Sequence, residues 1–351
     1  MKTIPVEPFP AAEDALDDPI VSPPPPSARP RPWRRILLFL LIYLLGLGSG
    51  YLLWEQFSPA SSRPGGESPA VADSAVGNRA APALPTPLPS PTPVSSQTPN
   101  LLPQSYTLPV SFGDIGPQLL ETGAIDYQKF VRVYERAGQP LTDEQLTILT
   151  TGSDAQVVFT PQNAYFLLNF FWALGLVNRN TLLTDGPMQQ YSDGDIGRFA
   201  STGGWTIGAR PATDLYASAD ILPLTPEQQG RLAEVSSAVY RPCCNNPAAF
   251  PDCNHGMAML GLLELLAARD ATTDELFEAA KYANAFWFPQ QSQEIALFFL
   301  KAKGKDFAAA DPRQFVGPYI ASASGFQSVH QWLADHDLLE QVPNSGNSCG
   351  V

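Results

Sequence analysis

The stretch "PQNAYFLLNFFWALGL" (residues 161–176) contains no charged residue, and a second stretch, "HGMAMLGLLELLA" (255–267), contains only Glu264. A helix on a protein surface has a polar face, whereas these two segments are apolar around most of their circumference. We therefore predict that both are central helices of a helical bundle; the alternative is that they are further membrane spans. Glu264 is either buried with a shifted pKa or lies at a helix edge and faces water.

The chain from about Leu108 to the C-terminus has apolar residues at helical spacing and well-marked helix starts, which predicts an all-α fold. Helices are expected near residues 126–137, 142–150, 161–177, 226–239, 255–269, 273–287, 290–303 and 326–340. Four pairs fit the pattern of a side chain that caps the first helical turn: Thr142 with Gln145, Thr225 with Gln228, Thr272 with Glu275, and Asp311 with Gln314. Three prolines are expected just inside their helices: Pro161, Pro226 and Pro312.

Two short sequence motifs recur along this domain. "GDIG" occurs at 113 and at 194, and "PLTDEQ" at 140 is similar to "PLTPEQ" at 223. One apolar segment follows each copy, which indicates two repeated helical units at 113–177 and 194–267. Chance matching of short polar words explains the pattern equally well.

The run "ILLFLLIYLLGLGSGYLLW" (36–54) is uncharged and long enough, at about 1.5 Å per residue, to cross a hydrocarbon core of about 30 Å. Four arginines lie just before it, at positions 29, 31, 34 and 35, and only Glu55 and the more distant Arg63 follow. The excess of positive charge places the N-terminus in the cytoplasm and the rest of the chain outside. We predict an uncleaved transmembrane signal anchor, with a cleaved signal peptide as the alternative. Gly46 and Gly50 form a GxxxG pair that can support a weak homodimer.

Proline accounts for 36 of the 351 residues and is concentrated in the N-terminal tail and between about Ser58 and Gln104. Segments rich in Pro, Ser, Thr and Ala lack the apolar residues needed to form a core. The predicted organisation is a disordered cytoplasmic tail (1–35), the anchor in the membrane (36–54), a disordered stalk (55–107) and an α-helical extracytoplasmic domain (108–351). The net charge of −13 argues against nucleic acid as a partner, because nucleic acid attracts basic patches.

Three of the four cysteines and one of the three histidines lie in "YRPCCNNPAAFPDCNHGMAML" (240–260), between two predicted helices. Cys253 and His255 fall at the first turn of the second helix, where free N–H groups favour a thiolate. Thiolate and imidazole ligands suit zinc or copper. The expected ligands are Cys253, His255 and one of Cys243 and Cys244, because the side chains of adjacent cysteines diverge.

A fourth ligand would come from elsewhere in the chain or from water. The protein candidates are His330, His336 and Cys349, and thioether ligation by Met257 or Met259 would favour Cu⁺. The alternative is structural: outside the cytoplasm an even count of cysteines favours disulfides, one from the loop to Cys253 and one that tethers Cys349. A catalytic or redox cysteine is the third interpretation. No P-loop, nucleophile elbow, HExxH motif or carboxylate pair is identifiable, so no residue pair calls for an enzyme.

The cysteine cluster, with Pro242 before it and a helix after it, resembles the cluster of uncharacterised bacterial envelope proteins that have a PCYCGC motif. The resemblance is confined to the cluster, and this chain lacks the alternating Cys-x-Cys-x-Cys pattern. What the resemblance implies is a metal site in the cell envelope.

A second candidate site is "GRFASTGGWTIGARPATDLY" (197–216), a loop rich in glycine and hydroxyl groups. Arg198 and Arg210 could face a carboxylate or phosphate while Trp205 stacks on a ring. The alternative is a surface loop packed by its tryptophan. Together these features predict a membrane-anchored extracytoplasmic binding protein with a Cys/His soft-metal site. The alternative is a disulfide-stapled helical scaffold or solute-binding module without a metal.

Overall fold

A computed structural model describes residues 100–339 of the chain. The described region is rich in helix and has one small two-stranded sheet, which the all-α prediction missed. The tail, the anchor and most of the stalk lie outside the described residues. Among residues 100–339, no helix is both long enough and apolar enough to cross a membrane.

The elements follow one another in a single order along the chain. They are β1 (Tyr106–Gly113), α2 (Ile115–Glu121), α3 (Tyr127–Arg136), α4 (Asp143–Thr150), β2 (Ser153–Phe159), α5 (Ala164–Val177), α6 (Thr181–Thr184), α7 (Pro187–Gln190), η1 (Ile196–Arg198), α8 (Ala200–Gly203), α9 (Ala212–Leu215), α10 (Pro226–Ala238), α11 (Asn254–Ala268), α12 (Thr273–Trp287), α13 (Pro289–Lys303), α14 (Pro312–Phe315), α15 (Pro318–Ala321) and α16 (Ala323–Asp335).

The starts of three predicted helices are confirmed in detail. Thr142, Thr225 and Thr272 each accept a hydrogen bond from the third helical residue, whose side chain bonds back to the threonine N–H. Asp311 also caps its helix, although its side chain accepts from Arg313 rather than from the expected Gln314. The predicted place of Pro161 inside its helix is wrong, because α5 begins only at Ala164 and the proline lies in the preceding turn.

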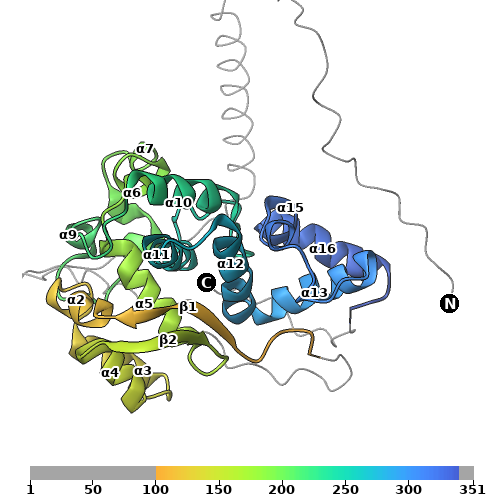
Figure 1. The fold of residues 1–351 in the computed structure, drawn as a ribbon. Coiled ribbons are helices and arrows are strands. Elements are labelled where there is room, and N and C mark those ends of the chain that lie inside the picture. The colour runs from red at the N-terminus through yellow and green to blue at the C-terminus, as the bar shows by residue number, and fades with distance from the viewer. Residues whose placement is uncertain (1–99, 340–351) are drawn as a thin grey trace, which may run out of the picture. The chain divides into compact units, whose positions relative to one another are not determined.

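Helices α5 and α11 form the centre of the fold, as their apolar sequences predicted (Figure 1). They cross where Gly175 faces Gly261. A Cβ atom on Gly175 would lie 2.2 Å from the Met257 carbonyl oxygen, and one on Gly261 would lie 2.3 Å from the Phe171 carbonyl oxygen. The two backbones are therefore in direct contact, which only glycine permits at this point.

The remaining elements surround this pair. Figure 1 shows α3 and α4 below the sheet, α2 at its left end, and α12, α13, α15 and α16 toward the right, while α6, α7, α9 and α10 lie above. Trp287 at the end of α12 donates its indole N–H to the Ala164 carbonyl at the start of α5, at 3.2 Å. This bond joins the C-terminal helices to the central pair.

The sheet consists of β1 and β2, which pair antiparallel although three helices separate them in sequence. The register shifts between Thr107 and Ser111, around Pro109, which has no N–H for the ladder. Leu108, Val110 and Phe112 point into the core at alternate positions. Strand β1 begins at Tyr106, two residues before the predicted domain boundary at 108.

The proposed repeat is only partly mirrored in the structure. Both halves contain a capped helix followed by a central helix, α4 then α5 and α10 then α11. The first "GDIG" motif joins β1 to α2, whereas the second runs from a turn into the short 3-10 helix η1. In the first half strand β2 lies between the capped helix and the central helix, whereas in the second half the cysteine loop connects them.

Glu264 of α11 is fully buried. Its carboxyl group accepts a hydrogen bond from the Asn180 side-chain amide, and its second oxygen, Oε2, has no partner. Burial raises the pKa of Glu264 well above its usual value, although the side chains of Asn178 and Asn180 oppose the shift. Burial therefore favours the neutral acid at Glu264, and the alternative that the side chain faces water is wrong.

This buried acid predicts a pH dependence of stability. The folded protein keeps the Glu264 proton at pH values where the unfolded chain has lost it, so its contribution to stability is full below about pH 4.5 and falls as pH rises. Glu264→Gln should remove this fall while keeping the shape of the side chain. The measurement is urea unfolding at pH 5 and pH 8, with the exposed Glu135→Gln as control. An unchanged pH slope in Glu264→Gln would count against a buried neutral acid.

Candidate metal centre

The cysteine loop connects α10 to α11. It begins with a tight turn in which the Cys244 N–H donates to the Arg241 carbonyl at 3.4 Å, with Pro242 and Cys243 at the two central positions. Proline suits the first central position because its φ is already fixed. The loop ends at Cys253, the N-cap of α11, whose Sγ accepts from the Gly256 N–H at 3.4 Å.

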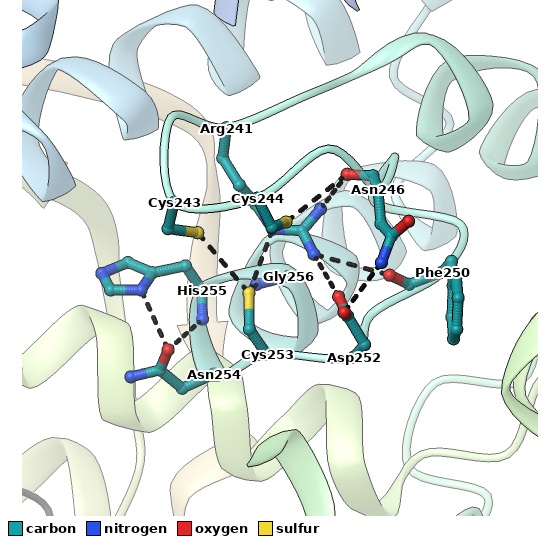
Figure 2. Close-up of polar contacts among 10 residues, drawn as sticks. All are labelled: Arg241, Cys243, Cys244, Asn246, Phe250, Asp252, Cys253, Asn254, His255 and Gly256. Carbon is teal, nitrogen blue, oxygen red and sulfur yellow. Dashed lines mark hydrogen bonds and ion pairs between the residues drawn. The ribbon is translucent and has the colours of Figure 1, made fainter. Parts of the chain in front are cut away.

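Three sulfur atoms meet at this end of α11. The Sγ atoms of Cys243, Cys244 and Cys253 all lie within 4.8 Å of one another, and those of Cys243 and Cys253 are 3.6 Å apart (Figure 2). The expectation that only one of the two adjacent cysteines approaches the shared site is wrong, because the turn brings both sulfurs beside Cys253. Three thiols this close could hold a metal ion.

Arg241 lies at the centre of the hydrogen bonds within the loop, and its side chain is fully buried. Its Nε donates to the Cys253 Sγ at 3.3 Å. Its terminal nitrogens donate to the carbonyl oxygens of Asn246 at 2.9 Å and Phe250 at 3.4 Å. Nη2 also forms an ion pair with the Asp252 carboxylate at 3.1 Å. Figure 2 shows the guanidinium in the middle of these groups. One side chain therefore ties both ends of the loop together.

Gly256 makes room for this guanidinium. A Cβ atom at Gly256 would lie 2.2 Å from the Arg241 Nη2. Sequence reasoning missed Arg241. The available signal was an arginine directly before the paired cysteines, with a glycine in the first turn of the next helix.

The electrostatics of the cluster favour one thiolate. The neighbouring thiols of Cys243 and Cys244, followed by the Arg241 charge, hold the pKa of Cys253 well below its usual value in spite of burial. The pKa of Cys243 is raised chiefly by its contacts with the other two thiols. Burial acts to lower the pKa of Arg241, but negative charge on the cysteines raises it overall. The arrangement therefore favours negative charge on the partly exposed Cys253 sulfur, next to the buried Arg241 guanidinium.

His255 is buried but does not belong to the group of close sulfurs. Its Nδ1 lies 3.0 Å from the Asn254 side-chain oxygen, and Figure 2 shows the ring turned toward that residue. The ring packs on Phe288 with centroids 4.4 Å apart. Burial lowers the pKa of His255 to about 4, so the ring is neutral, and its Nε2 is buried without a partner. A neutral imidazole with a free nitrogen is the form that binds metals.

The other predicted ligands lie apart from the cluster or outside the described residues. His330 bonds to Glu294 through Nδ1 at 2.7 Å, and His336 bonds to the Trp332 carbonyl at 2.7 Å. Met257 and Met259 are fully buried in the hydrophobic core. Cys349 lies outside the described residues.

The loop at 197–216 does not form a joint site. Trp205 is buried, its indole N–H donates to the Ala124 carbonyl at 2.7 Å, and its ring packs edge-on against Trp172. Arg210 bonds to the Thr122 carbonyl at 2.9 Å. Arg198 pairs with Asp193 in an open recess that Tyr191, Phe199 and Phe250 also line. The tryptophan packs the loop instead of facing a ligand.

No protein-family model, curated protein or solved structure matches this chain significantly. The resemblance of the cysteine cluster to the PCYCGC envelope proteins therefore stays a prediction.

Proposed function

We propose that this chain is a membrane-anchored extracytoplasmic protein that binds a soft metal ion, Zn²⁺ or Cu⁺, through Cys243, Cys244 and Cys253. The observation that carries the proposal is that the three sulfurs lie within 4.8 Å of one another. Zn–S bonds of about 2.3 Å put the sulfurs of a tetrahedral site about 3.8 Å apart. Small side-chain movements are therefore enough to close the three thiols around an ion.

The buried Arg241 supports this assignment. Three thiolates around Zn²⁺ leave a net negative charge, and around Cu⁺ a larger one, which a guanidinium next to the sulfurs offsets. Its N–H donates to the Cys253 sulfur at 3.3 Å, in the manner of the outer groups that orient metal ligands. The cluster is thus built for negative charge on sulfur, which metal thiolates require.

A fourth donor is not fixed by the sulfur geometry. His255 is a candidate because its neutral ring has a buried Nε2 without a partner and lies two residues after Cys253. Cys349 and water are the others. The uncharged run at 36–54 and the arginines before it support the membrane anchor and the extracytoplasmic location.

Metal titration of the reduced full-length chain tests the proposal. We expect one equivalent of Zn²⁺ or Cu⁺ per chain by elemental mass spectrometry after desalting, and none in Cys253→Ser, which removes the central sulfur. His255→Phe and Cys349→Ser should each lower the affinity only where that residue is the fourth ligand. Circular dichroism of every variant shows whether the fold is intact. A reduced wild-type chain that retains no metal would overturn the assignment.

The second candidate is a disulfide-stapled scaffold. The observation in its favour is the separation of 3.6 Å between the Cys243 and Cys253 sulfurs, since a disulfide needs a bond of about 2.05 Å and only a short approach. Intact mass of the chain from an oxidising compartment separates the two functions. A permanently oxidised chain without metal favours the staple.

A further inference from the structure

The three cysteines are not equivalent. The Cys243 and Cys253 sulfurs face each other at 3.6 Å, whereas the Cys244 thiol donates to the Asn246 carbonyl at 3.8 Å. Cys243 is exposed and Cys253 is partly exposed, so a small molecule can reach this pair. The geometry selects one pair for oxidation and leaves Cys244 as a thiol.

Cys253 is placed as the nucleophile of the pair. Its sulfur accepts hydrogen bonds from the Gly256 N–H at 3.4 Å and from Arg241 Nε at 3.3 Å, and it lies at the N-terminus of α11. Both donors and the helix dipole stabilise negative charge on sulfur. Cys243, at 3.6 Å, is in position to attack a mixed disulfide on Cys253.

We propose that Cys243 and Cys253 exchange with small disulfides to form a reversible disulfide, and that this disulfide and the bound metal exclude each other. The second half rests on the proposed metal function. In the first step the Cys253 sulfur attacks one sulfur of the small disulfide and releases one thiolate. In the second step Cys243 loses its proton and attacks the Cys253 sulfur, and the second small thiolate leaves. Two cysteine thiols are oxidised and one small disulfide is reduced to two thiols.

Metal release follows from the loss of two ligands. A sulfur in a disulfide no longer carries the negative charge with which it binds Zn²⁺ or Cu⁺. Oxidation leaves Cys244 as the single thiolate donor of the cluster, which is too few for a stable site. The site would therefore hold its metal under reducing conditions and release it on oxidation.

The test uses the full-length chain loaded with Zn²⁺ and treated with glutathione disulfide. We expect release of the zinc, loss of the mass of two hydrogens, and a peptide map that links Cys243 to Cys253 while Cys244 remains open to alkylation. Cys244→Ser should form the same disulfide. Cys243→Ser, a change at an exposed position, should stop at the mixed disulfide and gain the mass of one glutathione residue on Cys253. Dithiothreitol should reverse each product.

Different failures point to different parts of the proposal. A Cys243–Cys244 link, or zinc retained after the Cys243–Cys253 disulfide has formed, overturns the inference while metal binding stands. A reduced chain that never binds zinc but forms the Cys243–Cys253 disulfide overturns the metal function and leaves the exchange reaction. Zinc binding without any disulfide at high glutathione disulfide overturns the exchange reaction alone.

Discussion

Replacing Gly261 with valine is expected to destabilise the domain by about 3 kcal/mol, at the upper end for an overpacked core. The added Cβ would lie 2.3 Å from the Phe171 carbonyl oxygen and 2.7 Å from the Gly175 nitrogen. Both are backbone atoms of α5, so no side-chain rotation can relieve the overlap and the two central helices must separate. Urea or thermal unfolding of the variant measures the loss.

Gly230→Ala is the matched control for this change. Gly230 lies within α10, and a Cβ atom there would meet nothing within 4 Å. Alanine at such a position should stabilise the protein by about 1 kcal/mol through its better helix propensity. If Gly261→Val proved as stable as the wild type, α5 and α11 could not be in backbone contact.

Arg241→Leu is expected to cost about 3 kcal/mol, because it removes the fully buried partner of an ion pair whose Asp252 side chain is only 25% exposed. The substitution would leave the Asp252 carboxylate without its cation and the Asn246 and Phe250 carbonyl oxygens without a donor. The Cys253 sulfur would also lose the guanidinium N–H that donates to it at 3.3 Å, so reduced Cys253 should react more slowly with alkylating reagents. Chemical unfolding and alkylation rates give the two readouts.

Arg179→Leu serves as the comparison, because the Arg179–Asp220 ion pair is also short, at 3.0 Å, but both side chains are more than half exposed. A pair in that setting contributes about 0–1 kcal/mol. Equal losses in the two variants would mean that the burial of Arg241 carries no energetic weight.

The central helices could be predicted from sequence because two long apolar segments, one without a charge and one with Glu264 alone, stand out within an acidic domain. The capped helices could be predicted because the capping pattern is local, as at Thr142, Thr225 and Thr272. The sheet was missed for the opposite reason. The alternation of Leu108, Val110 and Phe112 is visible in β1, but Pro109 argues against a strand and the partner strand follows only after three helices.

The candidate site was found in part. The clustering of cysteines in sequence located it, and the start of α11 was predicted next to Cys253. That Cys243 and Cys244 both approach Cys253 depends on the turn at Pro242, and the burial of Arg241 depends on packing against Gly256. Neither follows from residue spacing. Trp205 suggested a ligand surface because an isolated sequence does not show that Trp172 covers its ring.

The cysteine loop forms hydrogen bonds with residues that follow it by about 80 positions in the chain. The Cys244 carbonyl accepts from the Ala323 N–H, and the Asn245 side chain accepts from the Ser324 N–H, each at 2.9 Å. At a synthesis rate of roughly 5–20 residues per second, the cysteines emerge from the ribosome several seconds before Ala323 and Ser324 are available to bond with the loop. The nascent thiols therefore pass through a period without their final neighbours, during which each of them can pair with another sulfur.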